Sequence, residues 1–258
     1  MKEGKMSIVV AYKYAANPQD ASVASNGAVD WTRAKSSVAE YDSVALTLAR
    51  EIADKVGTDV VGISVGKSDV ASSLAKKNAL SKGLDSALVV ADDETATWSA
   101  TGIASALAEL VKRVEGADLV LTGDSSIDEG ARLMSGLIAG FLNWPAFQNV
   151  VSVDKTPEGY SLVQQDGQGL RTILITGPVV VAAASDAVVA KVPSMKDILA
   201  AGKKNLETVA IADMEIVRPD IRIASTNKPQ MRARKNITFA GESAVTELVA
   251  ALKNDGVL

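Results

Sequence analysis

The part of the sequence best suited to bind a ligand is a short polar loop between an apolar run and an amphipathic segment. The loop covers residues 123–130 (GDSSIDEG), and residues 129–142 have the apolar spacing of a helix, with Arg132 in its first turn. Free N–H groups at a helix N-terminus bind phosphate, and an arginine there adds positive charge. An ordinary helix cap, supplied by Asp128 or Ser126, explains the same residues, so both interpretations stay open.

The chain lacks the side chains that most catalytic and metal centres require. Its 258 residues include no His and no Cys. This excludes disulfides, zinc sites with Cys or His ligands, and catalytic Ser-His or Cys-His pairs. The acidic pair Asp92-Asp93 ends an apolar run without a third ligand near it, and a solvated turn explains it. We therefore expect no catalytic residue and no metal site.

Two further features could touch a nucleotide. Lys13 follows the first apolar run, where it could meet a nucleotide or simply be solvated. Gly167 and Gly169 lack the third glycine of a dinucleotide fingerprint and lie between strands rather than before a helix. A hairpin turn is therefore the better interpretation for these glycines, and no Walker A loop is present.

Charge and hydropathy restrict partners and location. The net charge of -4 gives no electrostatic support for binding nucleic acid. No segment reaches the ~18 apolar residues of a membrane span, and the N-terminal residues lack the pattern of a signal peptide. We expect a cytoplasmic protein without membrane insertion.

The elements that must position the polar loop alternate regularly. Four apolar runs predict buried strands, at residues 7–11, 59–65, 86–91 and 118–122. Four amphipathic segments predict helices, at residues 41–56, 70–82, 97–114 and 129–142. This alternation predicts an α/β fold with a mainly parallel, doubly wound sheet. Ligands bind at the carboxyl ends of such strands, so the loops after Ala11, Val65, Ala91 and Thr122 should surround the site.

The pattern changes twice in the second half of the chain. Residues 149–153, 160–164 and 170–175 predict three strands in a small antiparallel insertion, residues 146–176, before residues 177–184 rejoin the sheet. We expect residues 1–204 to form the α/β nucleotide-binding domain. Residues 205–258 show little periodicity before a helix at 242–252, which predicts an extended C-terminal arm that needs a partner to cover it.

Motifs along nearly the whole chain resemble the β subunits of electron-transfer flavoproteins. The most similar branch is the one found beside anaerobic carnitine-type acyl-CoA metabolism. The resemblance implies a Rossmann-like domain of the adenine-nucleotide hydrolase-like type. The resemblance rests on the order and spacing of seven motifs: Ala11-Tyr12-Lys13, Tyr41-Asp42, residues 63–66, residues 80–83, residues 123–145, residues 178–181 and residues 192–201.

The resemblance implies cofactors and partners. It implies an electron-carrier subunit without catalytic residues, paired with an α subunit and serving acyl-CoA dehydrogenase-type partners. The β subunit would bind AMP, or a second FAD in electron-bifurcating members, while a redox FAD is shared with the α subunit. The residues that match the nucleotide site are Ala11, Ala39, Glu40, Tyr41, Asp42, Val65, Gly123, Asp124, Ser125, Ser126, Asp128, Gly130, Ala131, Arg132, Leu133 and Met134.

The resemblance also implies two contact surfaces. Pro193, Ser194 and Met195 match the loop whose apolar residue docks into partner dehydrogenases. Residues 205–258 match the arm that packs on the α subunit. The family usually has a Thr-Gly-Gln element in its phosphate site, and this chain has Arg132 to Gly136 (RLMSG) there.

Two alternative functions belong to other classes. An ATP-using enzyme of the same fold would carry a Ser-Gly-Gly-type phosphate loop after the first strand, where this chain has residues 13–17 (KYAAN). A stand-alone adenine-nucleotide-binding protein of the stress-protein kind would need no α subunit. The long arm and the order of the motifs favour the electron-carrier subunit.

Overall fold

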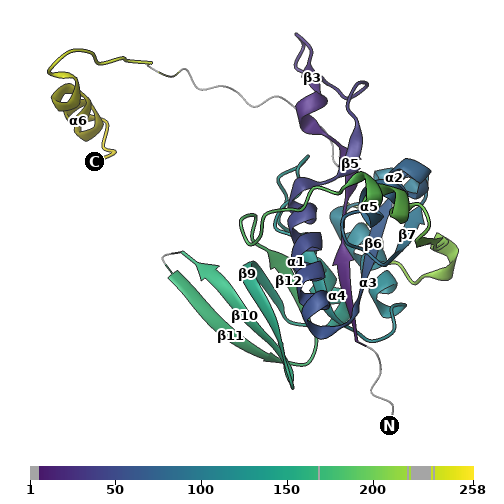
Figure 1. Ribbon diagram of the computed structural model, residues 1–258. Coiled ribbons are helices and arrows are strands. Elements are labelled where there is room, and N and C mark those ends of the chain that lie inside the picture. Colours follow the sequence, from purple (N-terminus) through teal and green to yellow (C-terminus); the bar gives the residue numbers. More distant parts are fainter. Residues whose placement is uncertain (1–5, 168, 220, 222–233, 235) are drawn as a thin grey trace. The chain divides into compact units, whose positions relative to one another are not determined.

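A nine-stranded sheet forms the centre of the first part of the chain (Figure 1). The computed structural model describes residues 6–167, 169–219, 221, 234 and 236–258. The chain divides into two units, Met1–Ala224 and Ser225–Leu258, which we describe separately. The strand order is β11-β10-β9-β12-β8-β1-β6-β7-β13.

The sheet is parallel except at one edge. Neighbouring strands from β9 to β13 pair in parallel, and only β9-β10 and β10-β11 are antiparallel. This confirms the predicted α/β fold with its mainly parallel sheet. The strands are β1 (Ser7–Ala11), β6 (Asp59–Gly66), β7 (Ser86–Ala91), β8 (Ala117–Gly123), β9 (Ala146–Thr156), β10 (Gly159–Asp166), β11 (Gly169–Thr176), β12 (Val179–Ala183) and β13 (Asn205–Thr208).

Helices cover both faces of the sheet. The helices are α1 (Glu40–Val56), α2 (Ser73–Leu80), α3 (Ala100–Lys112), α4 (Met134–Leu142) and α5 (Met195–Ala201) in the first unit and α6 (Ala244–Asn254) in the second. In β1, Ile8 and Val10 face one core cluster with α1 and α2, whereas Val9 and Ala11 face the other with α3 and α4. Because strand side chains alternate between faces, a strand buried on both faces needs apolar side chains on both faces, as residues 8–11 of β1 show.

Short turns set where the helices begin. The helices predicted at residues 70–82 and 97–114 are shorter, because 3₁₀ turns at η2 (Ser68–Ala71) and η3 (Asp93–Thr97) precede them. Ser72 and Ser99 then cap α2 and α3. The segment between β1 and α1, predicted as a loop, contains η1 (Pro18–Asp20) and two small sheets formed by β2 (Tyr14–Ala16), β3 (Ser22–Val23), β4 (Val29–Asp30) and β5 (Ser36–Val38).

The first unit extends beyond the boundary predicted at residue 204. Strand β13 pairs with β7, and the buried Val209 donates its N–H to the Val89 carbonyl at 2.8 Å. The turn η4 (Ile211–Asp213) follows, and the division falls at Ala224/Ser225. Residues 220, 222–233 and 235 of the predicted arm lie outside the described residues.

The second unit contains α6, in the place where a final helix was predicted. Its apolar side chains Val245, Leu248 and Val249 are exposed, so the described part of this unit does not bury them. Every helix among the described residues is too short or too polar to cross a membrane.

A partly buried polar cluster joins the antiparallel edge to the parallel sheet. The Tyr160 hydroxyl donates to Asp118 Oδ1 at 2.5 Å, and Lys155 Nζ lies 2.7 Å from Asp118 Oδ2. Lys155 also lies 4.2 Å from the centroid of the Tyr160 ring. Burial and the Asp118 carboxylate raise the pKa of Tyr160, so its hydroxyl remains a donor.

We expect Tyr160→Phe to lower the free energy of unfolding by about 1.5–3 kcal/mol, because a hydrogen bond to a charged acceptor is lost. Urea unfolding measures the change. Lys55→Gln, which removes an exposed pair with Asp154, is the control and should cost less than about 1 kcal/mol. Equal losses for the two variants would contradict a special contribution from the Tyr160 hydroxyl.

Candidate functional site

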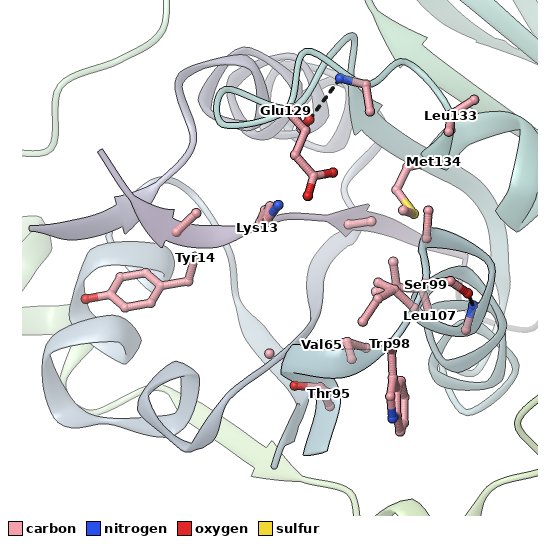
Figure 2. Close-up of a pocket in the computed structure, with 18 of the residues that line it drawn as sticks. Lys13, Tyr14, Val65, Thr95, Trp98, Ser99, Leu107, Glu129, Leu133 and Met134 are labelled. Carbon is pink, nitrogen blue, oxygen red and sulfur yellow. Dashed lines mark hydrogen bonds between the residues drawn. The ribbon is translucent and has the colours of Figure 1, made fainter. Parts of the chain in front are cut away.

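A cleft of about 1550 Å³ opens at the carboxyl ends of β1, β6 and β8. Its walls come from the residues after β1 and β6, the start of α3 and the loop between β8 and α4, together with Arg218, Pro219 and Ile221. Figure 2 shows Glu129 and Lys13 on one side of the cleft and Thr95 and Trp98 on the opposite side. This is the edge at which doubly wound sheets bind ligands.

Most of the predicted nucleotide residues lie around this cleft. Eleven of them line it: Ala11, Asp42, Val65, Gly123, Asp124, Ser125, Ser126, Ala131, Arg132, Leu133 and Met134. The others lie behind or beside it. Ala39 and Glu40 line a small neighbouring hollow, Tyr41 packs its backbone against Gly123, and Asp128 pairs with Lys13. Gly130 shapes the loop and does not line the cleft.

The Asp42 carboxylate holds the floor of the cleft together. Asp42 is only 8% exposed. Its Oδ2 accepts the Lys13 N–H at 2.7 Å and its Oδ1 accepts the Gly123 N–H at 3.2 Å. A Cβ on Gly123 would lie 2.5 Å from Asp42 Oδ1 and 2.8 Å from the Tyr41 carbonyl carbon. Glycine is therefore required where β8 ends against the first turn of α1.

The loop after β8 corrects the predicted start of the next helix. Helix α4 begins at Met134, not near Glu129. The reason is that Gly130 has a left-handed φ of 64° and donates its N–H to the Ser126 carbonyl at 2.9 Å, while the Ala131 N–H donates to Ser126 Oγ at 3.0 Å. Ser126 thus closes the loop on itself instead of capping α4.

Acidic residues of the loop form ion pairs with the two cations beside it. Lys13 Nζ lies 2.6 Å from Asp128 Oδ2. Arg132, which precedes α4 instead of lying in its first turn, places one terminal nitrogen 2.6 Å from Asp124 Oδ1 and from Asn149 Oδ1. Neither Asp128 nor Ser126 caps α4, and its N-cap residue Leu133 makes no capping side-chain bond.

The residues missed by sequence analysis lie on the opposite wall. Trp98, Ser99, Gly102 and Arg218 line the cleft. The Ser99 side chain accepts the Gly102 N–H, a cap pattern that could have located this wall after β7. Arg218 carried no such signal, because its contact with Trp98, at 5.3 Å from the ring centroid, joins distant segments.

The lining of the cleft is suited to binding a ligand. The described residues contain no group of three or more acidic side chains that could hold a metal ion. Apolar side chains such as Val65, Ile103 and Leu107 line the cleft together with the polar loop. Trp98 Nε1, in the lining of the cleft, is a buried polar atom that lacks a hydrogen-bond partner among the described residues. Buried groups of this kind are normally satisfied, which favours a bound polar ligand.

Comparison with known families decides the classification. A sequence model of the electron transfer flavoprotein domain matches residues 27–214. The chain belongs to this family. Electron transfer flavoproteins are flavin-binding electron carriers, so the prediction of the family and of a function in electron transport is confirmed. The matched residues include α1, β6, the start of α3 and the whole loop between β8 and α4.

The buried Asp42 of this electron transfer flavoprotein domain should make stability depend on pH. Burial raises the pKa of Asp42 to about 7, although the N–H groups of Lys13 and Gly123 and the Lys13 charge lower it. An unfolded aspartate titrates near 3.8. Between these values the folded protein holds a proton that the unfolded chain has lost, so this contribution to stability falls as pH rises through the window.

We expect the free energy of unfolding of the wild type, relative to Asp42→Asn, to fall between about pH 4 and pH 7. Urea unfolding at several pH values measures it. Asp93→Asn is the control, because hydrogen bonds from Ser68 lower the pKa of Asp93 and place its titration below this window. A difference between wild type and Asp42→Asn that is independent of pH would contradict the assignment.

Proposed function

We propose that this chain is the β-type subunit of a heterodimeric electron transfer flavoprotein. Its cleft binds a structural adenine nucleotide, which is AMP or, in a bifurcating protein, a second FAD. One observation carries the proposal: residues from β1, α1, β6 and the loop after β8, chosen for their likeness to a nucleotide site, line the same cleft. Four separate segments supply them, which a chance resemblance in one loop would not explain.

The cleft suits the parts of a nucleotide. Ala11, Val65 and Leu107 offer apolar surface for a base, and the N-terminus of α4 has no side-chain cap. Uncapped N–H groups at a helix N-terminus favour a phosphate. Lys13 and Arg132 are already paired with Asp128 and Asp124. A phosphate therefore binds by replacing a carboxylate as the partner of a cation.

The subunit positions cofactors and has no acid, base or nucleophile of its own to contribute. When bound, the flavin supplies the electron-accepting and electron-donating chemistry. A redox FAD is shared with the α subunit. The exposed apolar face of α6, formed by Val245, Leu248 and Val249, packs on that subunit as part of the arm predicted at residues 205–258.

Met195 is presented as a docking residue for acyl-CoA dehydrogenase-type partners. It is the first residue of α5 and is 72% exposed. Ser194 and Asp197 form a capping box: Ser194 Oγ accepts the Asp197 N–H at 3.2 Å, and Asp197 Oδ2 accepts the Ser194 N–H at 2.9 Å. This cap fixes the backbone after Pro193, so that the apolar side chain projects from a rigid support.

The nucleotide is tested on the purified α/β pair. Native mass spectrometry and flavin absorbance should reveal one flavin with AMP, or two flavins. Arg132→Gln should weaken nucleotide binding by about tenfold, because a charge-assisted hydrogen bond is lost. Asp124→Asn should strengthen binding, because it frees Arg132.

Arg171→Gln is the matched control for this experiment. Arg171 is also an exposed, paired arginine, 3.3 Å from Asp166, but it lies on β11 away from the cleft. A β subunit that carries no nucleotide while flavin is retained in the α subunit would overturn the proposal. Unchanged binding in Arg132→Gln would overturn the placement of the phosphate.

Electron transfer from a cognate acyl-CoA dehydrogenase tests the docking residue. Met195→Ala should lower the second-order rate by about tenfold, because an apolar anchor desolvated on docking is lost. Leu170→Ala, which truncates another exposed apolar side chain on β11, should leave the rate unchanged. An unchanged rate in Met195→Ala would remove Met195 from the interface.

A further inference from the structure

Residues 209–219 run back along α3 toward the cleft. The Arg113 guanidinium at the C-terminal end of α3 donates to the Asp213 carbonyl. Further on, the Val217 N–H donates to Ser105 Oγ at 2.9 Å. At the other end of the helix, Arg218 Cγ would lie 3.7 Å from a Cβ on Gly102. The segment therefore follows α3 from its end to its beginning; we name residues 209–219 the strap.

The first half of the strap is built into the core. Val209 is buried and bonded to Val89 next to the β13–β7 pair. Ile211 and Met214 pack against the apolar cluster of α3 and α4. Ser105 is 3% exposed and its hydroxyl accepts the Val217 N–H. A buried hydroxyl on α3 thus binds the backbone of the strap, and these contacts fix residues 209–217 against the core.

The second half is held by weaker contacts at the surface. Arg218 forms an ion pair with Glu94, and the two side chains are 47% and 53% exposed. The Arg218 guanidinium also lies 5.3 Å from the centroid of the Trp98 ring. Exposed ion pairs and cation–π contacts contribute little each. Beyond them, Pro219 and Ile221 line the cleft directly.

We propose that the end of the strap is a movable wall of the cleft and that Arg218 is the positioning residue that latches it. The end of the strap moves because its contacts are weak, whereas the first half is held in the core. The strap opens from Arg218 toward Val217, and its bond to Ser105 limits the opening. In the closed state Arg218 covers Trp98, so the ligand leaves the cleft only after the Arg218–Glu94 pair has broken. The identity of the ligand rests on the proposed function, but the latch does not.

The first test needs no ligand. In full-length protein with Trp31→Phe and Trp144→Phe, Trp98 is the single tryptophan, because the chain has 3. Arg218→Gln and Glu94→Gln should make its fluorescence more sensitive to acrylamide quenching. Arg171→Gln should not. The charge reversal Glu94→Arg with Arg218→Glu, which keeps the ion pair but loses the cation–π contact of residue 218, should restore part of the protection. Amide hydrogen exchange at Val217 in otherwise wild-type protein should rise in Arg218→Gln and Ser105→Ala.

The second test measures ligand release. AMP should dissociate about fivefold faster from Arg218→Gln than from wild type, in line with the loss of one ion pair and one cation–π contact. Equal Trp98 quenching and equal Val217 exchange in Arg218→Gln and wild type would overturn the latch, whatever the cleft binds. Altered quenching in a protein that binds neither AMP nor FAD would support the latch and overturn the nucleotide proposal.

Discussion

The buried Asp42 carboxylate is the interaction on which the cleft depends. Its two oxygens accept backbone N–H groups from the ends of β1 and β8, which are neighbours in the sheet. The same residue lies in the first turn of α1, so one side chain fixes two strand ends and one helix. The close approach of Gly123 follows from this bond. Lys13 leaves β1 from this point and reaches Asp128, which carries the constraint into the loop that forms the wall.

Electrostatics inside the cleft follow from that geometry. Three cations at its rim are each held by a carboxylate close by: Lys13 by Asp128, Arg132 by Asp124, and Arg218 by Glu94. A fourth cation, Lys67, lines the cleft together with the acidic residues Asp69 and Glu129. A cleft of this kind has little net attraction for an anion at a distance. In the proposed function, it selects ligands by exchange of partners at short range, where the geometry of the donor decides which acceptor is preferred.

The elements that could be predicted from the sequence are those whose structure is set by residues close together in the chain. Buried parallel strands are mostly apolar, and the capped or glycine-ended helices follow standard signals, as Gly57 does at the end of α1. The start of α4 was missed because Gly130 and Ser126 fold the loop back on itself, which no helical spacing records. Strand β13 was missed because this edge strand is mostly exposed and therefore lacks an apolar run. Arg218 was missed because its partners lie more than a hundred residues away.

The fold separates the cleft from Met195, the proposed docking residue. The cleft opens at the carboxyl ends of the strands, against α3, α4 and the first turn of α1, whereas α5, which begins at Met195, packs with α2. The sheet that carries both is buried on both sides and resists deformation. A side chain changed at one surface therefore leaves the backbone of the other in place. A substitution that weakens ligand binding but not docking, or docking but not ligand binding, therefore acts on one surface alone. A substitution that weakens both acts on the sheet that carries them.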